Sequence, residues 1–148
     1  MKIIIQRVKE AKMFVNTKYK CEIEQGILAF VGITHDDNEK DIDYCVDKLI
    51  NLRIFSDDDG KMNLSVQDVD GSLMIVSNFT IYGETRKGRS PSYTESAPAD
   101  KAREIYNIFL KKLLKTRVPF ETGEFQEHMD IEAINDGPIT LIIESPKK

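Results

Sequence analysis

The feature that most restricts the fold is a nearly all-apolar run at residues 27–33, Ile-Leu-Ala-Phe-Val-Gly-Ile. Such a run presents no polar side to water, so it predicts a central strand that is covered on both faces. The run Leu-Met-Ile-Val at residues 73–76 predicts a second buried strand for the same reason. The chain must therefore form a sheet with other elements packed against both of its sides.

Further strands are expected at both ends of the chain. Residues 3–9 are β-rich, and residues 13–23 predict a hairpin with its turn at Asn16-Thr17-Lys18. Residues 121–144 are expected to hold the last two or three strands. Among these, residues 129–134 alternate apolar and polar side chains, as a half-buried strand does.

A motif of six residues, Asn135-Asp136-Gly137-Pro138-Ile139-Thr140, separates this alternating segment from the apolar run at residues 141–143, which suits a buried strand. Asn, Asp, Gly and Pro favour tight turns on conformational grounds alone, so a turn between two strands is the simplest interpretation. A Pro that opens a strand also suggests an edge or a functional bend, because it cannot donate a ladder hydrogen bond. Both interpretations stay open from the residues alone.

Two amphipathic helices are predicted. The first follows capping groups at residues 34–38 and buries Ile42, Cys45, Val46, Leu49 and Leu52. The second begins near Pro98, ends by Val118-Pro119, and buries Ala102, Ile105, Tyr106, Phe109 and Leu113, with Leu110 and Leu114 widening the face. About seven strands with two helices predict an α+β fold with a curved, mostly antiparallel sheet or barrel-like core.

Length and composition predict one ordinary globular domain, residues 1–148. The chain has 41% hydrophobic and 31% charged residues and a net charge of −4, which does not suit a protein that coats nucleic acid through its whole surface. No apolar run approaches the roughly 20 residues of a membrane span, and the N-terminus turns polar at Gln6, too early for a secretory signal. We therefore expect a cytoplasmic protein with no membrane partner.

Known metal and cofactor patterns are missing from the sequence. Cys21 and Cys45 have no CxxC spacing and are expected to be buried free thiols. The acidic turn at residues 56–60 lacks the ligand spacing of a calcium loop, and the glycines match no phosphate-binding loop. His35 and His128 have no nucleophile beside them in sequence, and surface positions are expected for both. We expect neither a metal nor a cofactor.

Two stretches have residue types that suit chemistry. Ser77, Asn78, Phe79 and Thr80 follow a buried strand, where a rigid scaffold could hold their backbone N–H groups as an oxyanion hole. The alternative is that Ser77 and Thr80 only satisfy local backbone groups. The densest basic cluster, Arg86, Lys87 and Arg89, suits either contact with an RNA backbone or plain solvation.

Taken together, these stretches resemble the D-aminoacyl-tRNA deacylase family, also called D-tyrosyl-tRNA deacylase, over essentially the whole chain. Matching stretches include Gln6-Arg7-Val8, GITHDD at residues 32–37, LRIF at 52–55, DGKMNL at 59–64, TRKGRSPS at 85–92 and Glu121-Thr122-Gly123. The family's Asn-x-Gly-Pro-x-Thr motif is complete at residues 135–140. Its Ser-Gln-Phe-Thr motif is present at residues 77–80 with one departure, Asn78 in place of Gln.

The resemblance implies the family fold and a homodimer with two active sites at the subunit interface. It also implies that Gly137 and Pro138 are joined by a cis bond and enter the partner's pocket, where they hold the substrate α-amino group so that an L side chain would clash. Residues 77–80 would be catalytic, Phe125, Met129 and Asn135 would line the pocket, and Arg86, Lys87 and Arg89 would bind RNA. The shorter side chain of Asn78 puts in question a contact that the family makes from that position.

The implied reaction is hydrolysis of the ester that joins a D-amino acid, or glycine mischarged on a non-cognate tRNA, to the terminal adenosine of tRNA. Participation of the RNA 2′-hydroxyl and covalent attack by Thr80 are the two mechanisms, and the first is favoured. Two other classes of function remain: a module that binds tRNA ends without hydrolysis, and a dimeric structural protein. A deacylation assay separates all three.

Overall fold

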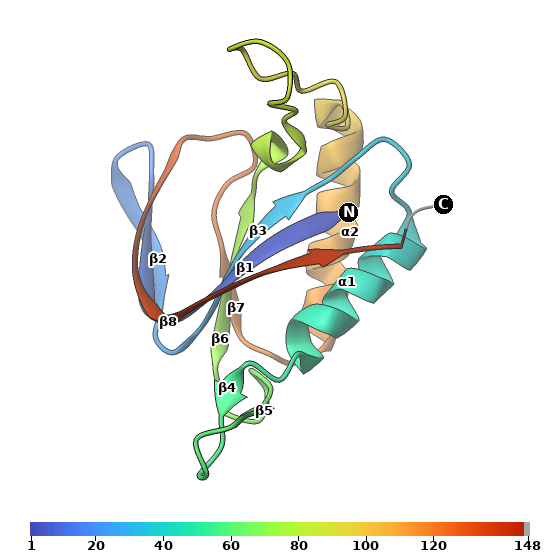
Figure 1. Ribbon diagram of the computed structural model, residues 1–148. Coiled ribbons are helices and arrows are strands. Elements are labelled where there is room, and N and C mark those ends of the chain that lie inside the picture. The colour runs from blue at the N-terminus through green and yellow to red at the C-terminus, as the bar shows by residue number, and fades with distance from the viewer. Residues whose placement is uncertain (147–148) are drawn as a thin grey trace.

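The computed structural model describes residues 1–146 and has a curved six-stranded sheet with two long helices against one face, and a separate two-stranded sheet (Figure 1). The strands and helices follow in the order β1 (Lys2–Val15), β2 (Lys18–Ile23), β3 (Gly26–Gly32), α1 (Glu39–Asn51), β4 (Phe55–Ser56), β5 (Met62–Leu64), β6 (Ser72–Ser77), the 3-10 turn η1 (Phe79–Tyr82), α2 (Ala99–Lys115), β7 (Phe120–Thr122) and β8 (Met129–Glu144). The predicted α+β class is confirmed.

The sheet is organised around β1, which contacts three other strands. The strand order is β2-β1-β3-β6-β7, and β8 also pairs with β1. The first half of β1 lies between β3 and β8, and its second half lies between β2 and β8, all antiparallel. The pairs β3–β6 and β6–β7 are parallel. Because β1 changes partners along its length, the sheet curls into a nearly closed, barrel-like core.

Hydrophobic side chains pack on both sides of this sheet. Ile27, Ala29 and Val31 of β3 face the core formed with α1 and α2. Leu28 faces the second core, inside the curl of β1, β2 and β6. The prediction of a central strand covered on both faces is therefore confirmed.

Strand β8 differs from the prediction of two strands joined by a turn. Both halves of β8 run antiparallel to the same strand, with Val8 opposite Asn135 and Gln6 opposite Thr140. The four residues between Asn135 and Thr140 therefore bulge out opposite Arg7 alone. Of the run expected in a buried strand, Ile143 is buried, whereas Leu141 and Ile142 are 42% and 64% exposed, because among the described strands β8 pairs only with β1 and is incompletely covered in the single chain.

Both predicted helices are present, and α1 begins with a side-chain cap whereas α2 begins after Pro98 without one. Asn38 accepts a hydrogen bond from the amide of Lys40 and forms a capping box with Asp41 at the start of α1. Helix α2 buries the five predicted side chains, but Leu114 is 71% exposed. The inclusion of Leu114 in the buried face was wrong, because this position lies beyond the stripe that contacts the sheet.

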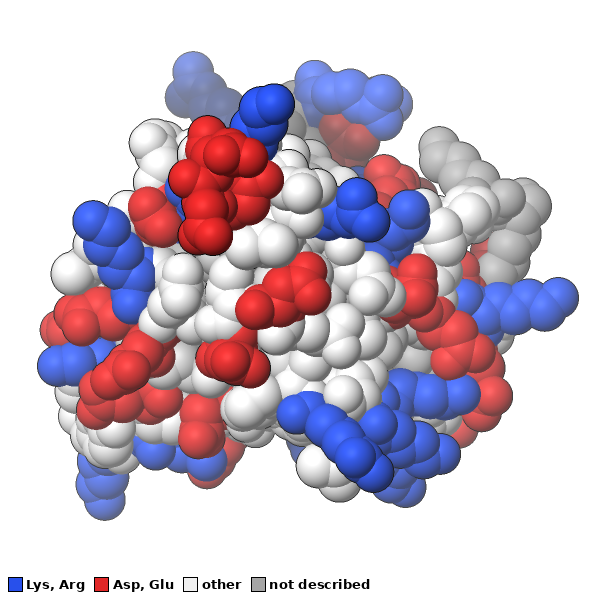
Figure 2. Space-filling model, turned by 90° about the horizontal axis from the view of Figure 1, so that it is seen from below, with Lys and Arg blue, Asp and Glu red and all other residues white. Residues whose placement is uncertain are grey.

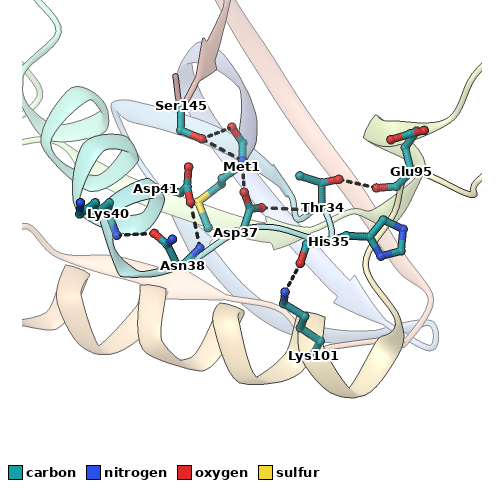
Figure 3. Close-up of polar contacts among 10 residues, drawn as sticks. All are labelled: Met1, Thr34, His35, Asp37, Asn38, Lys40, Asp41, Glu95, Lys101 and Ser145. Carbon is teal, nitrogen blue, oxygen red and sulfur yellow. Dashed lines mark hydrogen bonds and ion pairs between the residues drawn. The ribbon is translucent and has the colours of Figure 1, made fainter. Parts of the chain in front are cut away.

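The loop between β3 and α1 connects distant parts of the chain (Figure 3). The Met1 ammonium donates to Asp37 and to Ser145 Oγ, the latter at 2.9 Å. Thr34 Oγ1 donates to the Glu95 carbonyl at 2.6 Å, and Lys101 donates to the His35 carbonyl. This loop therefore holds the segment before α2 against the end of β3.

Charge is mixed on the face seen from below, where acidic and basic side chains are interspersed and blue side chains gather at one edge (Figure 2). Such a surface agrees with a small net negative charge and allows local basic regions. Within residues 1–146, no helix has the length and apolar character needed to cross a membrane.

Candidate functional site

A cavity of about 680 Å³ lies where β6 ends, between η1, the start of α2 and the segment that leads into β8. Its wall is mostly apolar, and its polar groups come from the turn that follows β6, from Ser96 and from residues 126–128. Its apolar side chains include Phe30, Val76, Ala102, Phe125, Met129 and Ile131. An apolar cavity with a few convergent polar groups is the usual form of a small-molecule site.

The turn after β6 brings Ser77, Asn78, Phe79 and Thr80 to this cavity. The backbone N–H of Asn78 donates to the Val31 carbonyl at 2.8 Å, and this bond places the turn over the end of β3. The Asn78 side-chain oxygen Oδ1 accepts from the Thr80 amide at 3.2 Å and from the Thr80 hydroxyl at 2.5 Å. The shorter side chain of Asn78 thus closes a local ring with Thr80, and the Thr80 proton is donated to an amide oxygen, which is not a base.

Contacts from the segment at residues 93–97 hold η1 in place. Ser96 Oγ donates to the Phe79 carbonyl at 2.8 Å, and the rings of Phe79 and Tyr93 meet edge to face at 5.1 Å. On the opposite side, a Cβ at Gly32 would lie 2.9 Å from the Cβ of Ile81. The turn is therefore fixed on both sides, although Phe79 itself is 61% exposed.

Phe125 and Met129 line the opposite wall. The Phe125 ring lies 5.8 Å from that of Tyr106. A Cβ at Gly123 would collide with the Met129 sulfur and would lie 2.7 Å from the Met13 sulfur, so any larger residue here would push these flexible side chains aside. Asn135, which was expected here, lies outside the cavity of its own chain, because its backbone pairs with Val8 and its side chain is exposed.

The bulge of β8 has the conformation that the motif implies. The bond between Gly137 and Pro138 is cis, and Gly137 has φ of 129°, a conformation that favours glycine. Both residues lie outside the cavity of their own chain, and Pro138 is exposed.

Arg7 anchors this bulge from β1. Its Nε donates to the Asp136 carbonyl at 3.1 Å and lies 3.3 Å from the Asp136 carboxylate. Its Nη1 donates to the Ile54 carbonyl at 2.7 Å.

The sequence placed Arg7 only in a matching stretch and indicated no role for it. A charged residue inside a β-rich segment was the available signal, since an arginine is rarely buried unless it is paired.

Both histidines lie near the cavity without a nucleophile as a hydrogen-bond partner. His128 lines the cavity and its Nε2 lies 2.9 Å from Asp130 Oδ1. His35 Nε2 lies 2.6 Å from the Thr94 carbonyl. Within residues 1–146, no hydrogen bond joins either ring to Ser77 or Thr80. The arrangement therefore does not form a serine-type triad.

The basic loop follows η1 and closes through an antiparallel bridge between Glu84 and Ser92. Arg86 is paired through two nitrogens with Glu84, at 2.8 and 2.6 Å, and these hydrogen bonds lower the pKa of Glu84 to about 2. Lys87 and Arg89 are exposed and have no salt bridge within the described part of the chain. These two side chains remain available to a ligand, whereas Arg86 is already neutralised.

This fold and site agree with the comparisons with known proteins. The sequence model described as D-Tyr-tRNA(Tyr) deacylase matches residues 4–144. The chain is 51% identical to the D-aminoacyl-tRNA deacylase of Thermosipho africanus over 99% of both chains, and 50% identical to that of Finegoldia magna over 98% of both. It also superposes with a TM-score of 0.94 on a solved structure titled c-Myc DNA Unwinding Element Binding Protein, which is 36% identical over 99% of this chain and all of the other.

The fold and the cavity define a protein with an apolar cavity at the end of a curved mixed sheet. The chain belongs to the D-Tyr-tRNA(Tyr) deacylase family.

Proposed function

We propose that this chain, acting as a single domain, hydrolyses the ester bond of D-aminoacyl-tRNA and releases free amino acid and tRNA. The main observation behind the proposal is that residues 77–80, Phe125 and Met129 line the same apolar cavity. The family match over nearly the whole chain supplies the substrate class. No metal or organic cofactor is required, because the ester is already activated and needs only orientation and charge stabilisation.

The amino acid is selected by a second copy of the chain. In a homodimer, Gly137 and Pro138 of one subunit enter the cavity of the other and hold the substrate α-amino group through backbone carbonyls. An L side chain then meets the wall, whereas D-amino acids and glycine are accepted, including glycine mischarged on a non-cognate tRNA. Support comes from the position of the Gly-Pro pair outside its own cavity and from exposed Ile134 and Ile142 on β8.

Hydrolysis uses the substrate's own hydroxyl group. The terminal adenosine occupies the apolar cavity, and its 2′-hydroxyl orients a water molecule that attacks the ester carbonyl. The Phe79 backbone N–H stabilises the developing oxyanion, the bond to the 3′ oxygen then breaks, and this oxygen leaves with the proton released by the water. The Thr80 N–H is partly occupied by Asn78, and the Thr80 hydroxyl donates to the same oxygen. Among the described residues no base accepts the Thr80 proton, and an unactivated hydroxyl is a poor nucleophile near neutral pH, so attack by water oriented by the 2′-hydroxyl is favoured over covalent attack by Thr80.

The basic loop contacts the RNA backbone next to the cavity. Lys87 and Arg89 supply the phosphate contacts, and Arg86 contributes less because it is paired with Glu84. Such contacts position the acceptor end without specifying sequence.

The experiment that tests this function is single-turnover deacylation of one tRNA charged with a D-amino acid, its L-enantiomer or glycine. The expected result is rapid hydrolysis of the D and glycyl esters and none of the L ester above the spontaneous rate. Tight binding of all three without hydrolysis would instead indicate a module that only recognises tRNA ends.

A further inference from the structure

Arg103 of α2 contacts the cavity wall from behind. Its guanidinium carbon lies 4.7 Å from the centroid of the Phe125 ring, and its Nη2 donates to Gln126 Oε1 at 3.3 Å. Phe125 and Gln126 line the cavity, whereas Arg103 itself does not. The guanidinium therefore touches two consecutive wall residues from the outside.

The segment that carries this wall has little regular structure of its own. Gln126 has φ of 67°, an uncommon conformation for a residue with a side chain, and the turn is closed by a hydrogen bond from the Glu127 amide to the Glu124 carbonyl at 3.3 Å. The other ring contact of Phe125 is with Tyr106, also from α2. Helix α2 thus holds the wall through one buried aromatic residue and one exposed cation.

Arg103 has no carboxylate within salt-bridge distance in the described residues. Its planar group is instead committed to an aromatic face and an amide oxygen, a combination that lysine cannot reproduce. An arginine kept only for solvation has no reason to adopt this geometry.

We propose that Arg103 is a positioning residue that fixes the Phe125–Gln126 wall and so sets where the substrate's terminal nucleoside lies. The inference rests on the proposed function only for the identity of the substrate. The support that Arg103 gives to Phe125 and Gln126, called bracing below, can be measured without an activity assay. The competing role for an exposed arginine beside this cavity is a direct contact with an RNA phosphate.

The test compares Arg103→Met and Arg103→Lys with Lys111→Met. The control removes an exposed charge from the same helix, at a position with no side-chain hydrogen bond or salt bridge among residues 1–146. The first measurement is hydrogen exchange of the backbone amides at residues 124–127. The second is single-turnover hydrolysis of two substrates, D-aminoacyl-tRNA and a D-aminoacyl ester of adenosine that has no phosphate.

Bracing predicts faster exchange of the Glu127 amide in both Arg103 variants and not in the control. It also predicts a loss of roughly three- to tenfold in kcat/KM with both substrates, with lysine failing to restore it. Unchanged exchange in Arg103→Met overturns the proposal. So does a loss confined to the tRNA substrate and restored by lysine, which assigns Arg103 to a phosphate. If the unmodified protein hydrolyses neither substrate, the proposed function fails, and the exchange result alone decides the bracing.

Discussion

The Nε of Arg7 donates to the carbonyl oxygen of Asp136 at 3.1 Å, and this contact joins the bulge of β8 to the strand beside it. Arg7 also lies 3.3 Å from the Asp136 carboxylate and is only 9% exposed. We expect Arg7→Met to leave the Ile54 carbonyl and the Asp136 carboxylate without their partner. Loss of a hydrogen bond to a charged group costs about 1.5–3 kcal/mol, measurable by urea unfolding.

The same variant should also lower the ratio of D- to L-ester hydrolysis, because the bulge loses its anchor. Lys9→Met is the matched control, since it removes an exposed charge from the same strand. Equal stability and equal selectivity in Arg7→Met and the control would contradict the anchoring role.

Thr80 is expected to be dispensable as a nucleophile. Its hydroxyl donates to Asn78 Oδ1 at 2.5 Å, so Thr80→Ala should keep activity within about tenfold, with the loss coming from the position of the turn. Replacing the 2′-hydroxyl of the terminal adenosine with hydrogen, with the amino acid held on the 3′ oxygen, should reduce the rate far more. A collapse of several orders of magnitude in Thr80→Ala, with the deoxy substrate still cleaved, would assign the attack to Thr80.

The effect on tRNA binding of neutralising a charge in the basic loop should depend on which residue is changed. If Lys87 and Arg89 each meet a phosphate, the double variant to Gln should weaken binding of every aminoacyl-tRNA alike. It should also reduce the slope of log K against log salt by about 0.7–0.9 for each phosphate that the variant no longer neutralises. Arg86→Gln should change the slope less, because Arg86 is paired with Glu84. An unchanged slope in the double variant would show that the loop meets only solvent.

Gly123→Ala should narrow the cavity. The added methyl group would occupy the position of the Met129 sulfur and would push that flexible side chain toward the cavity that it lines. We expect KM to rise with little change in the fold, because overpacking costs typically 1–3 kcal/mol. Steady-state kinetics together with the urea midpoint would check this. The control is Gly60→Ala, where no neighbour lies within 4 Å, although the positive φ of Gly60 makes some strain expected there.

Cys45 should be inert in the folded protein. Burial raises the pKa of its thiol from 9.0 to about 12, so the reactive thiolate is scarce at pH 8. Because the folded pKa is the higher one, this thiol stabilises the fold below pH 9, and that contribution is lost as pH rises from 9 toward 12. Alkylation followed by mass spectrometry should label Cys45 only under unfolding conditions. Rapid labelling of the native protein at pH 8 would contradict the burial.

The parts of the fold that the sequence predicted are those in which one local pattern decides the outcome. The apolar run at residues 27–33 favours a strand covered on both faces, and the spacing of Ile105 and Phe109 favours a helix packed on one side. The bulge could not be predicted this way, because a turn between two strands and a bulge within one strand use the same residues. The difference lies in β1, which pairs with both halves of β8.

In the candidate site, too, local patterns could be predicted from the sequence, whereas contacts between distant residues could not. Residues 77–80 were singled out because a cluster of polar side chains follows a buried strand, and all four line the cavity. The contacts of Arg7 with Asp136 and of Arg103 with Phe125 join residues far apart in the chain, and no local pattern indicates them. Leu141 and Ile142 suited a buried strand by composition, but burial depends on what covers β8.

Strand β8 pairs with the same strand on both sides of its bulge, and this arrangement affects how the sequence of the bulge can change. Thr140 and Asn135 are each held in register by β1, at Gln6 and Val8. The four residues between them have no register partner in β1, so the pairing on either side does not depend on them, although Asp136 is tied to the buried Arg7 and the two would have to change together. Under the proposed function, this short segment is therefore where substrate preference would change, in evolution or in the laboratory, while the paired strands keep their register.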